Sequence, residues 1–146
     1  MEAHAIAIEK PFSHSAAKFT ALVDRLGGSE VAGLAHGEVE QMLKADGFEL
    51  LRVLFEDHLN LRAQAMPQEL AVKGSDGQTR THRREMPRKL VTLFGMVELH
   101  ARMGWHCAGS DTLCALDAEL NLPPVIDSHS VRRRVAELAS VIRRLG

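Results

Sequence analysis

The chain has 146 residues, of which 45% are hydrophobic and 25% are charged, and its formal net charge is −1. This length suits one domain of about 100 to 150 residues, and the composition excludes a mainly disordered chain. No run reaches the ~18 apolar residues of a membrane span, and the first residues lack the pattern of a signal peptide, so we expect a cytoplasmic protein without membrane contact.

The first predicted element is a short helix over residues 13–26. Ser13 or Ser15 can cap its start, and Gly27 with Gly28 ends it. Its apolar face consists of Phe19, Leu22, Val23 and Leu26. This spacing of three and four residues is typical of an amphipathic helix.

The second predicted element is a much longer amphipathic helix that begins at about Gly37. Its apolar stripe runs through Val39, Leu43, Leu50, Leu54 and Leu61, and is widened by Met42 and Leu51. Gly47 lies inside this helix at a cost of ~1 kcal/mol relative to Ala, and it marks either a close helix contact or a break. We favour an unbroken helix roughly 40 Å long. Leu50 and Leu54 are expected in the main core, and His58, on the same stripe, is expected to be partly buried.

After Met66 and Pro67 the helical spacing gives way to alternation, which predicts a β-meander. The predicted strands cover 68–74, 78–85, 88–95 and 96–105, with turns at 74–77 and at Phe94-Gly95. One face of the last strand holds Val97, Leu99, Ala101, Met103 and Trp105. We expect this face to cover the long helix, because a small sheet is only marginally stable alone.

Two helices are predicted after the strands. The first runs from Leu113 to Leu120 and stops at residues 121–124, which include two prolines, and Ser128 or Ser130 can cap the second. The apolar seam of the second helix is Val131, Val135, Leu138, Ile142 and Leu145. Two such helices outline a helix-turn-helix, although their linker is long and packing is the commoner use of consecutive helices.

The sequence therefore predicts an α+β fold, in which a long amphipathic N-terminal helix packs on a small antiparallel β-meander and two C-terminal helices follow. We treat residues 1–146 as a single domain with four parts. These are a short helix and linker over 1–35, the long helix over 36–66, the β-meander over 67–106 and the helical C-terminal part over 113–146.

The near-neutral total charge conceals two unequal halves. Residues 1–77 hold 7 Lys or Arg against 12 Asp or Glu, a net charge of −5, whereas residues 78–146 hold 11 against 7, a net charge of +4. The basic residues gather in two runs, over 80–89 and over 132–144. Such clusters attract phosphate, although a solvated face or pairing with the acidic half would leave the same pattern.

Catalytic motifs are absent from the sequence. There is no P-loop, no dinucleotide-binding glycine pattern and no nucleophile elbow. Glu56, Asp57 and His58 are consecutive in a helix and therefore point in different directions. His106, Cys107 and Cys114 lack the paired spacing of a zinc site, and the two cysteines are too few for a disulfide framework. We expect no metal or other cofactor, no small-molecule ligand and two reduced core thiols.

Three blocks of the sequence carry a family resemblance: HGEVEQMLKADGFELLRVLFEDHLNLRA, RKLVTLFGMVELHARMG, and LDAELNLPP followed by SHSVRRRVAEL. In this order, over roughly residues 36–139, they resemble the N-terminal part of bacterial insertion-sequence transposases of the ISKra type. Asp127 and Ser130 stand where related sequences commonly carry an aromatic residue and a glycine. The family's catalytic part is an RNase-H-like fold with Asp, Asp and Glu for two-metal phosphoryl transfer. By this resemblance, that part lies beyond the point where this sequence ends.

The resemblance implies a truncated, non-catalytic transposase fragment that binds transposon-end DNA or assembles with itself or with full-length transposase. The side chains expected to contact DNA are Arg132, Arg133, Arg134, Arg143, Arg144, Arg83, Arg84, Arg88 and Lys89. Two alternatives stay open. An oligomerisation module would use the Val39-to-Leu61 stripe if the sheet fails to cover it, and a degenerate remnant would bind no DNA.

Overall fold

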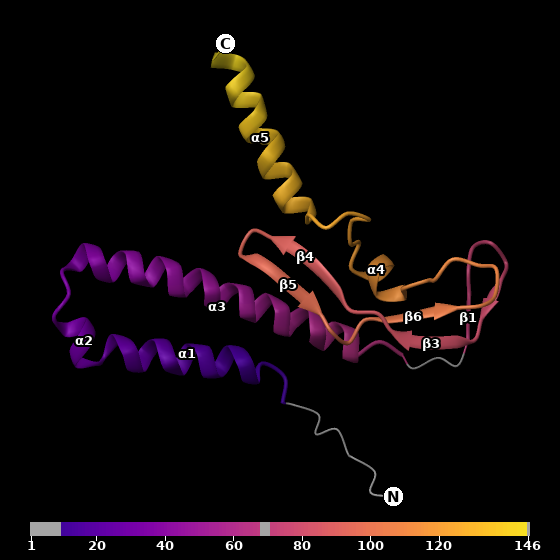
Figure 1. The fold of residues 1–146 in the computed structure, drawn as a ribbon, viewed down its shortest axis with the longest axis horizontal. Coiled ribbons are helices and arrows are strands. Elements are labelled where there is room, and N and C mark those ends of the chain that lie inside the picture. The colour runs from indigo at the N-terminus through magenta and orange to yellow at the C-terminus, as the bar shows by residue number, and fades with distance from the viewer. Residues whose placement is uncertain (1–9, 68–70, 146) are drawn as a thin grey trace, which may run out of the picture.

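The computed structural model describes residues 10–67 and 71–145, and it has the predicted α+β fold (Figure 1). None of the helices in this part of the chain is long and apolar enough to cross a membrane. In chain order the elements are α1 (Ser13–Leu26), α2 (Ser29–Ala32), α3 (His36–Gln64), β1 (Val72–Lys73), β2 (Thr79–Arg80), β3 (His82–Glu85), β4 (Arg88–Thr92), β5 (Gly95–Leu99), β6 (Met103–His106), α4 (Ala115–Glu119) and α5 (His129–Leu145).

Helices α1 and α3 lie side by side and run in opposite directions (Figure 1). The prediction of an unbroken long helix is confirmed, since α3 continues through Gly47 for 29 residues. The predicted serine cap of α1 is wrong, because the N-cap is Phe12 in the left-handed region, with φ of 62°. The Ser15 hydroxyl instead donates to Asp57 Oδ2 at 2.8 Å, and the Ser15 amide donates to the same oxygen at 3.0 Å. Asp57 of α3 thus fixes the start of α1.

The strands form one long ribbon and a small separate pair. β4 pairs with β5 across the turn that ends at Gly95, where φ of 118° favours glycine. The ribbon continues where β3 pairs with β6, and β1 pairs only with β2. Arg88 faces Leu99 whereas Glu85 faces Met103, so two residues oppose three and β5 is separated from β6 by a bulge.

This pairing differs from a simple meander, in which the predicted strand 78–85 would lie beside 88–95. The chain does not reverse at Pro87. The amide of Met86 donates to the carbonyl of Arg102 at 2.8 Å, which keeps the strand running along the same partner. The predicted strand 96–105 is therefore divided, and its second half pairs with β3.

The core lies where β5 crosses α3. Its buried members are Leu59, Ala63, Leu90, Val97, Leu99 and Leu116. The expectation that Leu54 lies in the core is wrong, because its side chain is 37% exposed, and Leu50 is only half-buried. The ribbon packs on the side of α3 that carries Leu59 and Ala63, which is not the side richest in leucine. His58, expected to be partly buried, is exposed for the same reason.

Helix α5 is joined to the body only at its start. The predicted cap is confirmed, since Ser128 Oγ accepts the amide of Val131 at 3.2 Å. Before it, the amide of Val91 donates to Ile126 at 2.8 Å and the amide of Ser128 donates to Val91 at 2.9 Å, so the linker lies along β4. From there α5 projects away from the body (Figure 1), and no residue of His129–Leu145 is buried.

Candidate functional site

The five arginines of α5 are all exposed. Arg134 lies 3.9 Å from Glu137, one turn further along the helix, and this is the single ion pair within His129–Leu145. At 3.6 residues per turn, Arg133 and Arg144 fall on the side opposite the apolar seam, whereas Arg132, Arg134 and Arg143 flank that seam. The helix therefore presents a continuous basic surface and, behind it, an apolar one.

The other predicted basic residues belong to the ribbon. Arg83 and Arg84 are exposed on β3 and, being consecutive in a strand, point to opposite faces. Lys89 is exposed on β4. β3 lies at the far end of the ribbon from the start of α5 (Figure 1), so the two basic runs of the sequence do not form one surface.

Arg88 has a structural role that the sequence pattern does not indicate. Its side chain is only 15% exposed and lies 3.2 Å from Asp117 of α4. Its second terminal nitrogen donates to the carbonyl oxygens of Pro123 and, at 2.9 Å, Val125. Arg88 therefore fastens the linker before α5 to β4, and both of its terminal nitrogens already donate to acceptors within the protein.

Asp117 holds a second arginine that sequence reasoning missed. Arg102 donates from Nε and Nη2 to the two oxygens of Asp117 at 2.8 and 2.6 Å, and from Nη1 to Met86 at 3.0 Å. The hydrogen bonds to Asp117 raise the pKa of Arg102 above its usual value. Nearby, burial raises the pKa of the Cys114 thiol. Arg88, Arg102 and Asp117 are far apart in the sequence, so this cluster can be recognised only in the folded structure.

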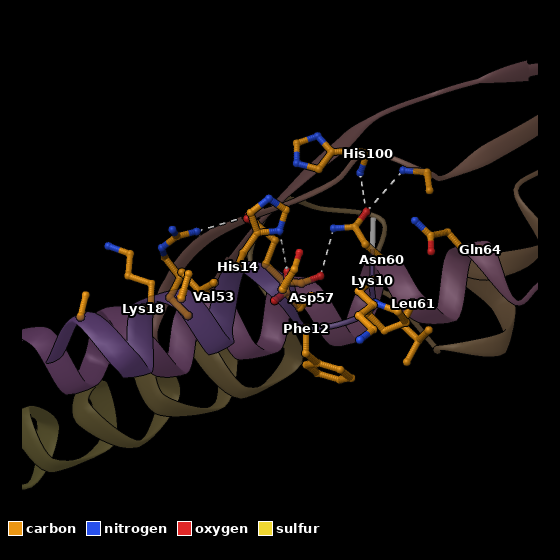
Figure 2. A pocket seen from close by; sticks show the side chains of 17 residues that line it. Lys10, Phe12, His14, Lys18, Val53, Asp57, Asn60, Leu61, Gln64 and His100 are labelled. Carbon is orange, nitrogen blue, oxygen red and sulfur yellow. Dashed lines mark hydrogen bonds and ion pairs between the residues drawn. The ribbon is translucent and has the colours of Figure 1, made fainter. Parts of the chain in front are cut away.

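A groove of about 800 Å³ opens between α1, α3 and the residues after β5 (Figure 2). Basic groups around it come from α1, α3 and the ribbon, and Figure 2 labels Lys10, His14, Lys18 and His100 among its lining residues. The sequence predicted no ligand site here.

The polar groups at the floor of the groove bond to the protein itself. Asn60 Oδ1 accepts the amides of His100 and Ala101 at 2.8 and 3.3 Å, and Asp57 accepts from Ser15. Glu56 Oε2 accepts the amide of Glu98 at 2.8 Å. These contacts tie α1 and β5 to α3. They also confirm that Glu56, Asp57 and His58 do not converge, since Glu56 and Asp57 serve different elements and His58 is exposed.

Metal-ligating side chains are scattered. Within residues 10–67 and 71–145, no three His, Cys, Asp or Glu side chains lie close enough together to hold a metal ion. Cys107 and Cys114 are free thiols, but both are half-buried and neither belongs to the core predicted for them. The centre of the His106 ring lies 5.4 Å from that of His82, with the two planes tilted by 48°, and the buried Nδ1 of His106 has no hydrogen-bond partner in the described structure.

Comparison with known proteins adds no relative. The chain matches no protein-family model, and neither the curated proteins nor the solved structures include one that is significantly similar to it. The resemblance to ISKra-type transposases therefore stays a prediction from the three sequence blocks.

Proposed function

We propose that this chain is a non-catalytic, DNA-binding module of the kind found at the N-terminal side of ISKra-type transposases, acting in the cytoplasm on transposon-end DNA. The observation that carries the proposal is α5, which projects from the body with five exposed arginines and a single acidic residue. Guanidinium groups suit phosphate because their planar donors match its oxygens.

The start of α5 favours the same partner. Arg132, Arg133 and Arg134 occupy its first two turns, where the helix dipole adds to the positive charge. The anchoring of the linker by Arg88 and Val91 holds this end in a fixed direction relative to the ribbon. A basic helix presented rigidly away from its own domain is suited to lie against a charged polymer.

The test is a titration of duplex DNA by fluorescence anisotropy across a series of salt concentrations. Because contacts to phosphate release counterions, log K should fall linearly with log salt, with a slope of ~0.9 for each contact. Replacing Arg132, Arg133 and Arg134 together by Gln should flatten that slope by up to about 2.7 if each arginine contacts one phosphate.

The matched control changes three exposed lysines elsewhere to Gln: Lys10, Lys44 and Lys73. It removes the same formal charge and should leave the slope within experimental error of the parent. No binding at low salt, or equal slopes for the parent and the arginine variant, would contradict the proposal.

The non-catalytic part of the proposal has its own assay. Supercoiled and end-labelled DNA incubated with the protein and Mg²⁺ or Mn²⁺ should remain uncut. Cleavage that survives repurification and disappears when one Asp or Glu is changed would overturn it. The parentage is tested separately by translating the DNA after codon 146 in all three frames, where the family's acidic triad is expected.

A further inference from the structure

Among residues 10–67 and 71–145, the apolar seam of α5 has no partner. Val135, Leu138 and Ile142 are 61%, 56% and 70% exposed, and Val141 and Leu145 continue the seam. Most of the stability of a helix in a protein comes from packing of its apolar face, and isolated helices of this length are marginal in water. A surface that buries this seam would therefore stabilise the 17-residue helix α5.

A second unpartnered apolar face lies on the helical pair. On α1, Phe19, Val23 and Leu26 are 57%, 49% and 37% exposed, at the spacing of one helix face. The corresponding exposed residues of α3 are Leu43, Leu51 and Leu54. The ion pairs Arg25–Asp46 and Lys18–Glu49 set the register of the two antiparallel helices, and by it Leu26 lies near the level of Leu43 and Phe19 near that of Leu51. We refer to these six residues as the α1–α3 face.

Within one chain the seam and the α1–α3 face are held apart. The ribbon lies between them, because β5 packs on α3 while α5 leaves from β4 (Figure 1). The two backbone hydrogen bonds of Val91 and the bonds of Arg88 fasten the linker at that point. A surface on another molecule can therefore cover the seam, which none of residues 10–67 and 71–145 buries.

The charge of each surface indicates which one can cover the seam of α5. α5 carries five Arg and one Glu, so a second α5 would bring like charges together. Residues 10–67 carry eight Asp or Glu against six Lys or Arg, and most of those basic residues already pair within the body. Glu30 and Glu40 make no ion pair with any described residue and remain exposed. These carboxylates carry the charge opposite to that of Arg132, Arg134 and Arg143, which flank the seam.

We propose that the apolar seam of α5 in one copy packs on the α1–α3 face of a second copy, and that α5 of the second copy packs in the same way on the α1–α3 face of the first. The lengths agree, since α5 is about 26 Å long and α1 about 21 Å at 1.5 Å per residue. The exchange is a closed two-fold arrangement, and each copy contributes both surfaces. Two helix contacts per dimer bring the interface toward the ~1,600 Å² of stable complexes. Arg133 and Arg144 stay outside it and remain available to DNA.

The first test is the mass in solution by light scattering after size exclusion, at about 100 µM chain. The parent should have twice the chain mass of 16.1 kDa. Changing Leu138 and Ile142 to Asp should give the single-chain mass. The matched control places two aspartates on the opposite side, Ala136→Asp and Ser140→Asp, and should remain dimeric. A monomeric parent, or a seam variant that stays dimeric, would overturn the proposal, and circular dichroism verifies that each variant is folded.

The second test distinguishes this exchange from pairing of two α5 helices. A variant with Val23→Asp and Leu54→Asp lacks the face but keeps the seam, and it should be monomeric alone. Mixed with the seam variant at high chain concentration it should form a heterodimer weaker than the parent dimer, because one intact seam then meets one intact face and the second contact is lost. A face variant that dimerises by itself would show that α5 pairs with α5, and a mixture that stays monomeric even at high concentration would contradict the exchange. Changing Arg133 and Arg144 to Gln should weaken DNA binding and leave the dimer intact, so the two proposals can fail separately.

Discussion

The arginines of the ribbon and those of α5 look alike in the sequence and differ in the structure. In and beside the ribbon, Arg80, Arg88 and Arg102 are 2%, 15% and 13% exposed. Their donors point at carboxylates and at backbone carbonyls from distant parts of the chain. In α5 every arginine is exposed, and among the described residues a carboxylate lies within 4 Å of Arg134 but of none of the other four. The comparison teaches that a run of basic residues has two uses, internal cross-linking and external contact, which require opposite environments.

The two groups of arginines differ in how many hydrogen-bond acceptors the fold places around them. A buried guanidinium is costly unless its donors are all satisfied, so it is retained only where folding gathers several acceptors around it. Irregular segments such as 107–114 and 120–128 have carbonyls that no regular strand or helix uses, and Arg80 and Arg88 bind these groups. α5 is regular throughout, so its own carbonyls are used within the helix and its arginines face solvent.

The largest effect is expected where the ribbon packs on α3. Leu99 is fully buried, so Leu99→Ala should lower the free energy of unfolding by ~2 to 5 kcal/mol through lost burial and an added cavity. Leu54→Ala, at a site 37% exposed, should cost less than about 1 kcal/mol in dilute solution. Chemical denaturation of both variants measures this, and equal losses would mean that the leucine-rich side of α3 is covered after all.

A smaller effect is expected at the carboxylate shared by Arg88 and Arg102. Asp117→Asn keeps the shape of the side chain but removes the charge, so it should cost about 1.5 to 3 kcal/mol, the value of hydrogen bonds to charged groups. The counterpart on α5 is Glu137→Gln, which affects only an exposed pair and should change stability by less than ~0.5 kcal/mol. If thermal melts rank the two variants the other way, the contrast between the two groups of arginines fails.

The sequence predicted the elements well and their packing less well. The helix over 13–26, the unbroken helix through Gly47 and the cap at Ser128 follow from local spacing and turn chemistry, which the sequence records directly. The core side of α3 was missed because its leucine-rich stripe suggested the wrong face. The sheet instead selects the side whose polar residues, such as Glu56 and Asn60, can bond to the backbone of β5 and of the residues just after it.

For the candidate site, the sequence identified which residues are basic but not which are available. Arg88 belongs to the same run as Arg84 and Lys89. Only the path of residues 121–127 past β4 shows that its Nη2 already donates to the carbonyls of Pro123 and Val125. The groove between α1 and α3 could not be anticipated either, because its lining comes from segments far apart in the chain. Both depend on long-range contacts that no local pattern encodes.

The smallest effect concerns pH and the turn between β1 and β2. Asp76 accepts from both terminal nitrogens of the nearly fully buried Arg80, at 3.1 and 2.7 Å, and from the amide of Gln78 at 3.0 Å. The hydrogen bond from Arg80 is the main reason that the pKa of Asp76 falls from 3.8 to about 2. The folded state therefore binds fewer protons than the unfolded state between these values. The stabilisation is complete above pH ~4 and is lost as the pH falls toward 2.

Asp76→Asn removes this pH-dependent stabilisation without altering the turn residues Gly74 and Gly77. The parent should be the more stable protein at pH 7, and the two stabilities should converge as the pH is lowered from about 4 to 2. Urea denaturation at several pH values checks the convergence, and carbon NMR of the Asp76 carboxyl follows its titration directly. An Asp76 that titrates near its ordinary value would show that Arg80 is held by the carbonyls of Asp111 and Gln78 alone, and that internal cross-linking in the ribbon needs no carboxylate at this position.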